Sequence, residues 1–534
     1  METSEKSVMG GALEMVRGEI AAHEKRVKGR YERLWAYYRN PMVVRAAEER
    51  RGFWGGVRGQ VRDGRWYELA QEVGLPARLM GASGRVVMGP GSSGVAAAQG
   101  RSRERVIEND IAWRVQTMVD FMFGKPVVLL SAAADAKKRE VIRRVLDAVW
   151  QGSGGVSLLQ DAALLGSVFG SVDLLVRVDD ALFAQGAEAG GAVGVSDLRR
   201  IAELVRIEVI EPRRGVAKMR ATDYRELDAY AVLHGLRGER VREVEVEGVE
   251  PRGWIGRVME AARKGAAGVG VEVGGKREEV VEVLTAEGSA VFVGERLVRE
   301  SGARSRGWSG GVVPVVHVQN IAQPFAYDGM SEVEPLIPLQ DELNTRLSDR
   351  ANRVTMQSFR MYLAKGMEGA GTMEIGPGVV WTTENQSAQV QAFGGDAACP
   401  SEEQHIREIR EAMDKVSGIP PIASGVVQAK IGNLSSANAL RVTLMGILSK
   451  TARKRLTYGR GIQRVSQLVL AALDHAGVLK TEPEEREIVL EWPDPLPEDE
   501  RERVFVAEAK LRLGVPKERI LAELGYGPGD AGVM

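Results

Sequence analysis

The sequence predicts an α+β protein of several domains, in which long helices alternate with β-rich segments. Apolar residues recur at helical spacing in residues 12–50 and again in 437–475. Between residues 204 and 318 a series of short strand-like segments is separated by Gly or Pro, which is typical of an antiparallel β unit. A chain of 534 residues is long enough for roughly three or four such units.

The N-terminal part reads as helices followed by a change to strands. The first helix, 12–50, should break at Asn40-Pro41. Later segments are predicted in chain order as a Gly/Ser-rich loop at 81–102, helices at 105–123, 135–150 and 156–168, a strand at 172–178 and a second loop at 184–196.

A helix is expected over residues 331–358. Ser331 followed by Glu334 forms a capping-box pattern at its start. Pro335 and Pro338 fall in the first turns, where proline is best tolerated. Strands then return at 359–398, before another helix at 401–417. A small β module between two helices favours an extended stalk with a tip over one compact domain.

The C-terminal part begins with a loop that reaches residue 436, and a long helix follows over 437–475. Residues 496–524 read as two helices that are separated at Gly514-Val515-Pro516.

Composition is that of an ordinary globular protein with balanced charge. The chain has 72 basic and 73 acidic residues, so any nucleic-acid contact should be local rather than spread over the surface. Cys399 is the single cysteine, which excludes an intrachain disulfide and fits a reducing compartment. The N-terminus lacks an apolar signal region, and no long uncharged apolar run is present. We therefore expect a protein made and used in cytoplasm.

One long segment departs from this balance. No Asp or Glu occurs between Lys415 and Leu473. The segment contains nine cations: Lys415, Lys430, Arg441, Lys450, Arg453, Lys454, Arg455, Arg460 and Arg464. Surface cations are usually interleaved with acids, so this pattern indicates a segment close to a polyanion, although a solvated face would look similar.

The helix in this segment is predicted to have two faces. At about 100° per residue, an apolar stripe roughly 80° wide forms on one side, and Lys450, Arg453, Arg460 and Arg464 fall on about the opposite side. The stripe consists of Leu440, Leu444, Ile447, Thr451, Tyr458, Ile462, Val465, Val469 and Leu473. Arg441 and Arg455 lie at the apolar margin, which suggests pairing with acids of a neighbouring element or subunit. Gly446, Gly459 and Gly461 suggest a bend or a close helix contact.

No pattern in the sequence indicates catalysis, a metal or a cofactor. Gly270 to Lys276 fits a phosphate-binding loop, but Arg277 stands where Ser or Thr is needed, and the flanks are strands. The G-x-S-x-G match at Gly307–Gly311 precedes a strand rather than a helix. The five histidines are far from one another in sequence and from Cys399, so no metal-ligand spacing exists. We expect a protein that is not an enzyme.

Several segments resemble the portal proteins of tailed bacteriophages, in the branch with the SPP1-like architecture. The ordered segments that carry the resemblance are Asn109 to Ile111 with Phe123 to Pro126, Ala162 to Gly170, Val313 to Asn320 with Gly329 to Val333 and Pro338 to Asn344, Gly432 to Leu440, and Trp492 to Pro497. The group spanning 313–344 is the strongest match, and together the segments cover about residues 105–525.

The resemblance implies a ring, typically a homododecamer, at one capsid vertex. Its domains would be an N-terminal helical and α/β wing (1–330), two stem helices (331–358 and 401–417), a β clip (359–400), a tunnel loop (418–436), a tunnel helix (437–475) and a C-terminal crown (476–534). The ring would act in DNA packaging and DNA ejection and serve as a head-tail connector. The protein would reside in the virion, after assembly in host cytoplasm.

The resemblance also implies partners and site residues. Double-stranded DNA would pass residues of the tunnel loop and helix, namely Lys430, Asn433, Lys450, Arg453, Arg460 and Arg464. The clip would dock the terminase large subunit and later a head-tail adaptor through Met373, Glu374, Trp381 and Glu384, and the ring would meet major capsid and scaffolding proteins. Arg441 and Arg455 would serve the subunit interface. Channel walls of this family are often acidic, whereas this helix is basic, which leaves open which cations face DNA.

Two other classes of function remain open from the sequence. A nuclease or ATPase subunit would need a carboxylate or phosphate-loop constellation, which the sequence lacks. A non-ring DNA-binding or scaffold protein of a phage particle would share the basic helix and would stay a monomer or small oligomer.

Overall fold

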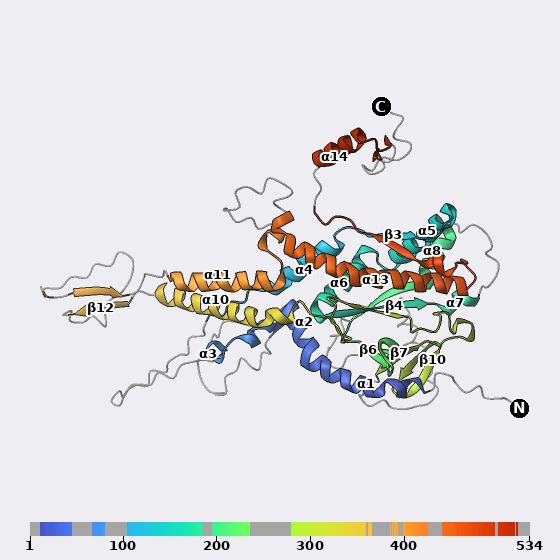
Figure 1. The fold of residues 1–534 in the computed structure, drawn as a ribbon. Coiled ribbons are helices and arrows are strands. Elements are labelled where there is room, and N and C mark those ends of the chain that lie inside the picture. The colour runs from blue at the N-terminus through green and yellow to red at the C-terminus, as the bar shows by residue number, and fades with distance from the viewer. Residues whose placement is uncertain are drawn as a thin grey trace. The chain divides into compact units, whose positions relative to one another are not determined.

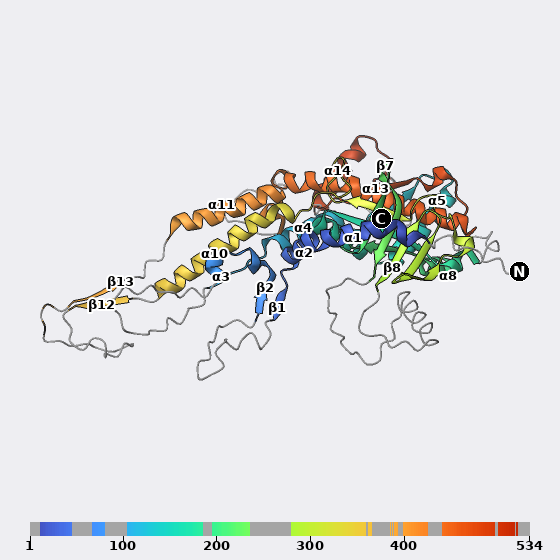
Figure 2. The same ribbon diagram turned by 90° about the horizontal axis from the view of Figure 1, so that it is seen from below.

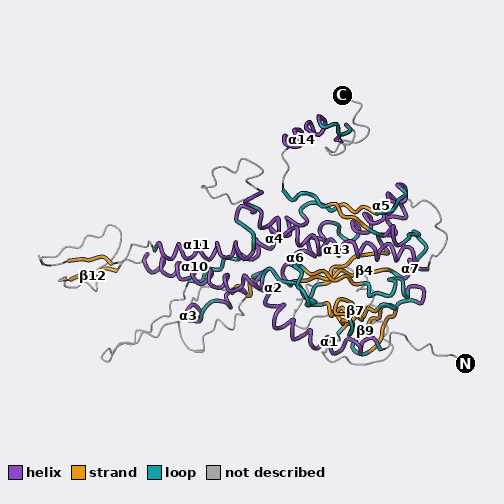
Figure 3. Tube along the Cα trace, viewed as in Figure 1, coloured by secondary structure: helices purple, strands orange, loops and turns teal. Residues whose placement is uncertain are grey.

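The computed structural model describes residues 11–44, 67–80, 104–184, 195–234, 279–358, 361–365, 385, 387, 389–393, 399–424, 441–496, 500–517 and 520–521. The chain forms two compact units. The first contains residues 1–118, 161–175 and 209–461, and the second contains 119–160, 176–208 and 462–534. The predicted loop at 81–102 and the Gly270–Lys276 match lie outside the described residues. Figure 3 distinguishes helices, strands and loops along the trace.

A five-stranded antiparallel sheet lies in the first unit, in the order β10-β9-β8-β7-β6. This confirms an antiparallel β unit, although the strands at Val205–Ile210 and Val315–Gln319, which the prediction included, belong to a separate three-stranded sheet. Alternate residues of β7 face opposite sides, as strand geometry requires: Ala229 and Ala231 join one apolar cluster, and Tyr230 and Val232 join another. The strands are β6 Gly215–Arg220, β7 Asp223–Leu233, β8 Val280–Thr285, β9 Ser289–Val293 and β10 Arg296–Glu300.

Each face of this sheet is covered within the first unit. Helix α1 (Ala12–Arg26) packs on the Ala229 side through Ala12 and Val16. On the Tyr230 side lie Leu175 and Val315, which belong to β4 (Ser171–Val178) and β11 (Val315–Gln319). These two strands pair antiparallel, with His317 directly opposite Asp173.

The N-terminal helix is shorter than predicted. After α1 a π-helical turn, Val27–Tyr31, leads into α2, Glu32–Arg39. Asn40 adopts a left-handed conformation with φ of 44°, which ends the helix at the predicted break. The chain then continues as strand β1 (Met42–Val44), which pairs with β2 (Tyr67–Leu69). The prediction of helix beyond residue 40 was therefore wrong over the described residues.

Two long helices of the first unit pack side by side, α10 (Ile337–Ser358) and α11 (Pro400–Ser417), as Figures 1 and 2 show. Strands β12 (Met361–Lys365) and β13 (Gln389–Phe393) lie between them in sequence and pair antiparallel. The predicted helix, small β module and second helix are thus confirmed as elements.

The start of α10 differs from the capping-box prediction. The hydroxyl oxygen of Ser331 accepts hydrogen bonds from the amides of Val333 and Glu334, at 3.1 and 3.2 Å. It therefore caps a short 3-10 turn, Glu334–Leu336, and the α-helix begins after that turn. The Glu334 side chain accepts a hydrogen bond from Arg30 at 2.8 Å.

A core in the first unit joins the helices to the loops between them. Tyr31, Leu34, Phe169, Leu343 and Ile409 are among its buried members. The ring centroids of Tyr31 and Phe169 lie 5.4 Å apart in an edge-to-face arrangement, which is favourable for aromatic pairs. This core fixes the start of α10 and the end of α11 close to α2.

Other elements complete the two units. Helix α13 runs from Met445 to His475, and positions 437–440 of the predicted helix lie outside the described residues. Its first part belongs to unit one and its last part to unit two. In the second unit β3 (Val128–Ser131) pairs with β14 (Ile488–Glu491). The remaining helices are α3 Ala77–Met80, α4 Asp110–Phe123, α5 Ala136–Gly152, α6 Val156–Phe169, α7 Asp180–Ala184, α8 Val195–Leu204 and α14 Glu500–Arg512; the remaining strand is β5 Val205–Ile210, and the remaining 3-10 turns are Ala70–Gly74, Ala303–Ser305, Pro421–Ser424 and Pro483–Arg486.

Helices α4, α5 and α6 confirm the three helices predicted between residues 105 and 168, and β4 confirms the strand predicted at 172–178. Helix α8 was not predicted. Its first two residues fall in the loop that was expected at 184–196. Among the described residues, no helix combines the length and apolar character needed to cross a bilayer.

Candidate nucleic-acid interface

Helix α13 has the buried stripe that its sequence predicts. Ile447, Tyr458, Val465 and Leu473 are each at most 2% exposed. Leu444, Thr451, Ile462 and Val469 are also buried, which confirms the predicted packing face at every member whose side chain the structure describes. Leu440 lies outside those residues.

Two glycines let other segments approach this part of the chain closely. A Cβ on Gly461 would lie 2.5 Å from Cγ2 of Val318, closer than real Cβ contacts, so β11 can reach α13 only because the residue is glycine. A Cβ on Gly446 would lie 3.1 Å from the carbonyl oxygen of Gly418. The close helix contact that the glycines suggested is confirmed at these two positions.

The cations of α13 divide into an exposed set and a buried set. Arg453 and Arg460 are exposed in the first unit, and Arg464 is exposed in the second. Arg464 donates a hydrogen bond to the side-chain amide oxygen of Gln467 at 3.2 Å. Because this amide is neutral, the bond does not neutralise the charge of Arg464. These three arginines can present positive charge to a polyanion.

Lys450 belongs to the buried set, so its placement on the exposed cationic face was wrong. Its ammonium lies 2.5 Å from one carboxylate oxygen of Glu332 and donates to the carbonyl of Ser417 at 2.9 Å. Lys450 is 7% exposed. The helical wheel could not reveal this, because the counter-charge comes from a distant part of the sequence.

Lys454 shares the same carboxylate. Its ammonium lies 2.6 Å from the other oxygen of Glu332 and donates to the hydroxyl of Ser167 at 2.8 Å. The side chain is fully buried. Two ammonium groups thus meet one buried carboxylate, and we call Glu332, Lys450 and Lys454 the charged junction.

The protonation of the charged junction follows from this geometry. Burial raises the pKa of Glu332, but the ammonium groups of Lys454 and Lys450 outweigh it and hold the pKa far below its usual range. Burial lowers the pKa of Lys454, and the second ammonium of Lys450 acts in the same direction, while Glu332 opposes both. The carboxylate therefore stays ionised, and with both lysines protonated the junction carries excess positive charge.

Neutral groups complete the hydrogen bonding around Glu332. Asn320 donates through Nδ2 to a carboxylate oxygen at 3.1 Å, and the Ser167 hydroxyl donates to the same oxygen at 3.2 Å. The hydroxyl of Tyr458 donates to the side-chain oxygen of Asn320 at 3.2 Å. The Glu332 amide donates to the Ser167 carbonyl at 2.8 Å. Buried polar groups need such partners. Here the partners join α6, α13 and Asn320, which is the residue that follows β11.

A second buried ion pair lies at the end of α11. Arg114 contacts Asp110 at 3.1 Å and Asp414 at 2.7 Å. It also donates to the Ser417 hydroxyl and the Ile419 carbonyl, both at 3.0 Å. Together with the bond from Lys450 to the Ser417 carbonyl, this gives the C-terminal turn of α11 two cations, which the helix dipole favours.

Other predicted site residues fall in different places. Arg441 is exposed and Arg455 is half-buried, and their assignment to a subunit interface stays a prediction. The tunnel-loop residues Lys430 and Asn433 lie outside the described residues, as do the clip residues Met373, Glu374, Trp381 and Glu384.

The residues that sequence reasoning missed are the partners of the buried lysines. Ser167, Asn320 and Glu332 each fall inside a segment singled out for its resemblance, but nothing in their spacing indicated that they meet. Buried lysines on an acid-free helix require an acid from elsewhere in the chain, but the sequence did not show that these lysines are buried.

Across the described part of the chain, His, Cys, Asp and Glu side chains form no group of three or more that could hold a metal ion. The G-x-S-x-G match contains Ser309, which is buried and donates its hydroxyl hydrogen to the carbonyl of Val312 at 2.5 Å. That hydroxyl is engaged in a local turn.

Comparison with known proteins bears on the same region. No curated protein matches the chain. Among solved structures, a chain in the neck of an empty GTA particle, computed with C6 symmetry, aligns with a TM-score of 0.41 and 14% identity, over 78% of this chain and 90% of that one. A chain in the virion of a native gene transfer agent particle aligns with a TM-score of 0.37 and 13% identity, over the same shares.

The family model described as phage portal protein, SPP1 Gp6-like, matches residues 278–525. That range contains β11, both long helices α10 and α11, the charged junction's Glu332 and the whole of α13. Over residues 278–525 this chain is therefore similar to the phage portal proteins that this family model describes.

Proposed function

We propose that copies of this chain form a closed ring, a dodecamer, at a single capsid vertex, and that double-stranded DNA passes through the ring during packaging and ejection. The observation that carries the proposal is the family match over residues 278–525, which includes the helix with three exposed arginines. Contacts between copies in such a ring are heterologous and closed.

The proposal assigns each region a part. Residues 1–330 form the wing, α10 and α11 the stem, 359–400 the clip, 418–436 the tunnel loop, α13 the tunnel helix and 476–534 the crown. The clip docks the terminase large subunit during packaging and a head-tail adaptor afterwards, and the wing meets capsid and scaffolding proteins. The chain assembles in host cytoplasm and resides in the virion.

The chemistry of α13 supports a sliding contact with DNA. Arg453, Arg460 and Arg464 are suited to phosphate oxygens, which carry no sequence information. DNA that must move through a channel would be slowed by base-specific bonds, and phosphate contacts avoid them. The role is mechanical and needs no catalytic group, so we propose that the protein is not an enzyme.

Electron microscopy and mass measurement of the purified full-length chain test the proposal. Rings with a central channel are expected. Monomers or dimers under all conditions would contradict it and favour a non-ring DNA-binding or scaffold protein. Metal-dependent DNA cleavage by the purified protein would instead revive a nuclease.

A further inference from the structure

Residues 320–330, which we call the strap, connect strand β11 to the charged junction. The strap is fixed at its first residue, where the side-chain amide of Asn320 donates to Glu332, and the chain just after the strap is fixed where the amide of Glu332 donates to Ser167. It is also fixed at its middle, where the side-chain amide of Gln319 donates to the carbonyls of Ala326 and Tyr327, at 2.7 and 3.0 Å. A third attachment comes from His317 on β11.

Both ring nitrogens of His317 face hydrogen-bond acceptors. Nδ1 lies 2.7 Å from a carboxylate oxygen of Asp173, and Nε2 lies 2.7 Å from the backbone carbonyl of Tyr327. Neither oxygen can donate. A neutral imidazole has one N–H and one lone pair, so it can satisfy one of these contacts only. The doubly protonated ring satisfies both.

His234 in the same unit provides a contrast. The guanidinium of Arg214 lies 3.1 Å from its Nδ1, and the carboxylate of Glu282 lies 3.2 Å from its Nε2. Arginine can only donate and a carboxylate can only accept, so a neutral ring with its proton on Nε2 satisfies both contacts. These two contacts of His234 can be met by a neutral ring, whereas the two acceptors that face His317 require the charged form.

The groups around His317 come from several elements. Asp173 also accepts hydrogen bonds from the hydroxyls of Tyr230 and Tyr327, at 2.6 and 3.4 Å. The Tyr327 ring stacks on His317 with a centroid distance of 3.7 Å. Burial lowers the pKa of His317, but the charge and hydrogen bond of Asp173 outweigh burial, and the pKa is raised above its ordinary value.

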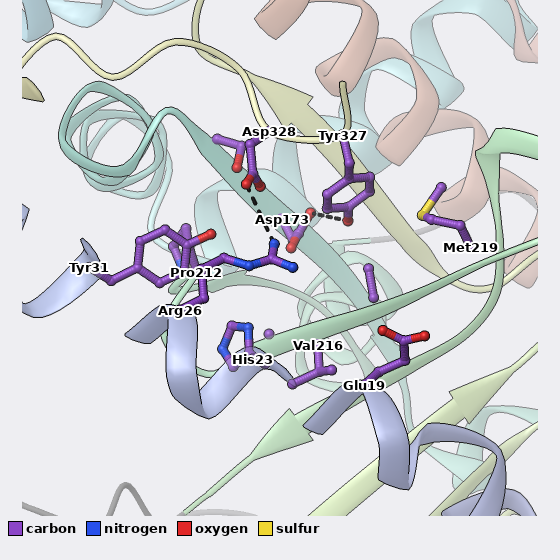
Figure 4. A pocket seen from close by; sticks show the side chains of 13 residues that line it. Glu19, His23, Arg26, Tyr31, Asp173, Pro212, Val216, Met219, Tyr327 and Asp328 are labelled. Carbon is purple, nitrogen blue, oxygen red and sulfur yellow. Dashed lines mark hydrogen bonds and ion pairs between the residues drawn. The ribbon is translucent and has the colours of Figure 1, made fainter. Parts of the chain in front are cut away.

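A cavity of about 220 Å³ borders Asp173 and Tyr327 and brings further charged groups near (Figure 4). Asp328 lies there, with Arg26 at 3.5 Å and Arg30 at 3.6 Å. The cavity is also lined by Glu19, His23 and Tyr31. Burial, the largest effect, lowers the pKa of His23 and raises that of Tyr31 to about 12, so neither supplies an added charge at neutral pH. The Asp173 carboxylate is the acid in direct contact with His317, and the charge of Asp328 raises the pKa of His317 further.

We propose that the strap is a proton-dependent clamp: it closes on His317 in the imidazolium form and loosens when the ring loses a proton. Loss of the Nε2 or Nδ1 proton would place a lone pair against the Tyr327 carbonyl or the Asp173 carboxylate. Because the strap leads directly into Ser331 and Glu332, loosening would reach the charged junction beneath α13.

The direction of the pH effect follows from linkage. The pKa of His317 is higher in the folded than in the unfolded chain, where it is about 6.5. Its contribution is fully present below that value and is lost as pH rises through the folded pKa. The clamp is therefore closed in mildly acidic solution and opens toward alkaline pH. This inference does not depend on ring formation.

Hydrogen exchange of the full-length chain, followed by mass spectrometry from about pH 6 to pH 9, tests the clamp. With exchange times corrected for the intrinsic effect of pH, wild-type amides in residues 320–330 should lose protection as pH rises. In His317→Gln the same amides should exchange faster at low pH and show no further pH dependence. His405→Gln is the matched control, since His405 is exposed and pairs with Glu342 at 3.3 Å.

A second variant keeps the test decisive if His317→Gln does not fold. Asp173→Asn removes the counter-charge while retaining an acceptor oxygen, and it should lower the pH at which the strap loses protection. Strap protection that stays constant with pH in the wild type would overturn the clamp. An unchanged pH profile in Asp173→Asn would also overturn it.

Discussion

Lys450 and Lys454 lie inside the protein, whereas Arg453 and Arg460 on the same stretch of α13 lie outside. The sequence presents all four as one cationic cluster, but they perform two separate tasks. The lysines end in a compact ammonium that two oxygens of one carboxylate can accommodate. The arginines keep their charge at the surface. Positive charge on a helix therefore does not by itself mark a nucleic-acid face; the location of the counter-charge decides.

The largest expected effect comes from removing that counter-charge. Glu332→Gln leaves two buried ammonium groups without a carboxylate, and breaking a buried ion pair costs about 3–5 kcal/mol. Chemical unfolding of the variant should show a loss of this size. Glu334→Gln is the matched control, because Glu334 is exposed, pairs with Arg30 and should cost less than about 1 kcal/mol. Equal losses in the two variants would contradict the account of the charged junction.

The wild-type protein should lose part of its stability in acid for the same reason. The pKa of Glu332 is depressed in the folded state, so its contribution is present above the unfolded value of about 4.3 and is lost as pH falls toward the folded pKa. Unfolding measured between about pH 5 and pH 2 should show a steeper decline in the wild type than in Glu332→Gln. Parallel curves would mean that Glu332 is not held ionised by the lysines.

Removing one lysine should cost less than removing the glutamate. Lys450→Met leaves Glu332 paired with Lys454 and relieves the excess positive charge, so we expect a loss of about 1–3 kcal/mol, mainly from the unsatisfied Ser417 carbonyl. Lys450→Met/Lys454→Met should be worse than either single variant, since it leaves a buried carboxylate alone. Additive single effects in the unfolding free energy would contradict a shared carboxylate.

The smallest effect on stability is expected for the exposed arginines. Arg453→Gln/Arg460→Gln/Arg464→Gln should change the free energy of unfolding by no more than about 0.5 kcal/mol per substitution, because no described acid pairs with these side chains. Ring formation should be unaffected.

In contrast, Arg441→Gln and Arg455→Gln should reduce ring yield if these residues serve the subunit interface, which mass measurement can detect.

The sequence was sufficient for elements whose pattern is local. The stripe of α13, most strands of the five-stranded sheet and the existence of α10 and α11 follow from period and turn residues, whereas strand β6 was not predicted. The α-helix after Ser331 begins later than expected, after a 3-10 turn, and the local pattern also did not reveal that the Ser331 hydroxyl donates to the carbonyl of Val168 in a distant helix.

The charged junction could not be read from the sequence, because it is made by contacts between distant residues. Glu332 and Lys454 are separated by 122 positions, and Ser167 and Lys454 by 287. Similarly, the apolar residues around His317 in the sequence do not identify its partners. Its charge depends on Asp173, which lies opposite it only because β4 and β11 pair in this register.

Genome retention by particles that carry the triple arginine variant tests the central claim most directly. Arg453→Gln/Arg460→Gln/Arg464→Gln rings should assemble normally and be incorporated into capsids, yet the particles should package or retain less DNA than the wild type, with the deficit growing at higher salt. Full DNA retention by intact variant rings would contradict the claim that the exposed face of α13 meets DNA. Failure of the rings to assemble would show that these arginines hold subunits together instead.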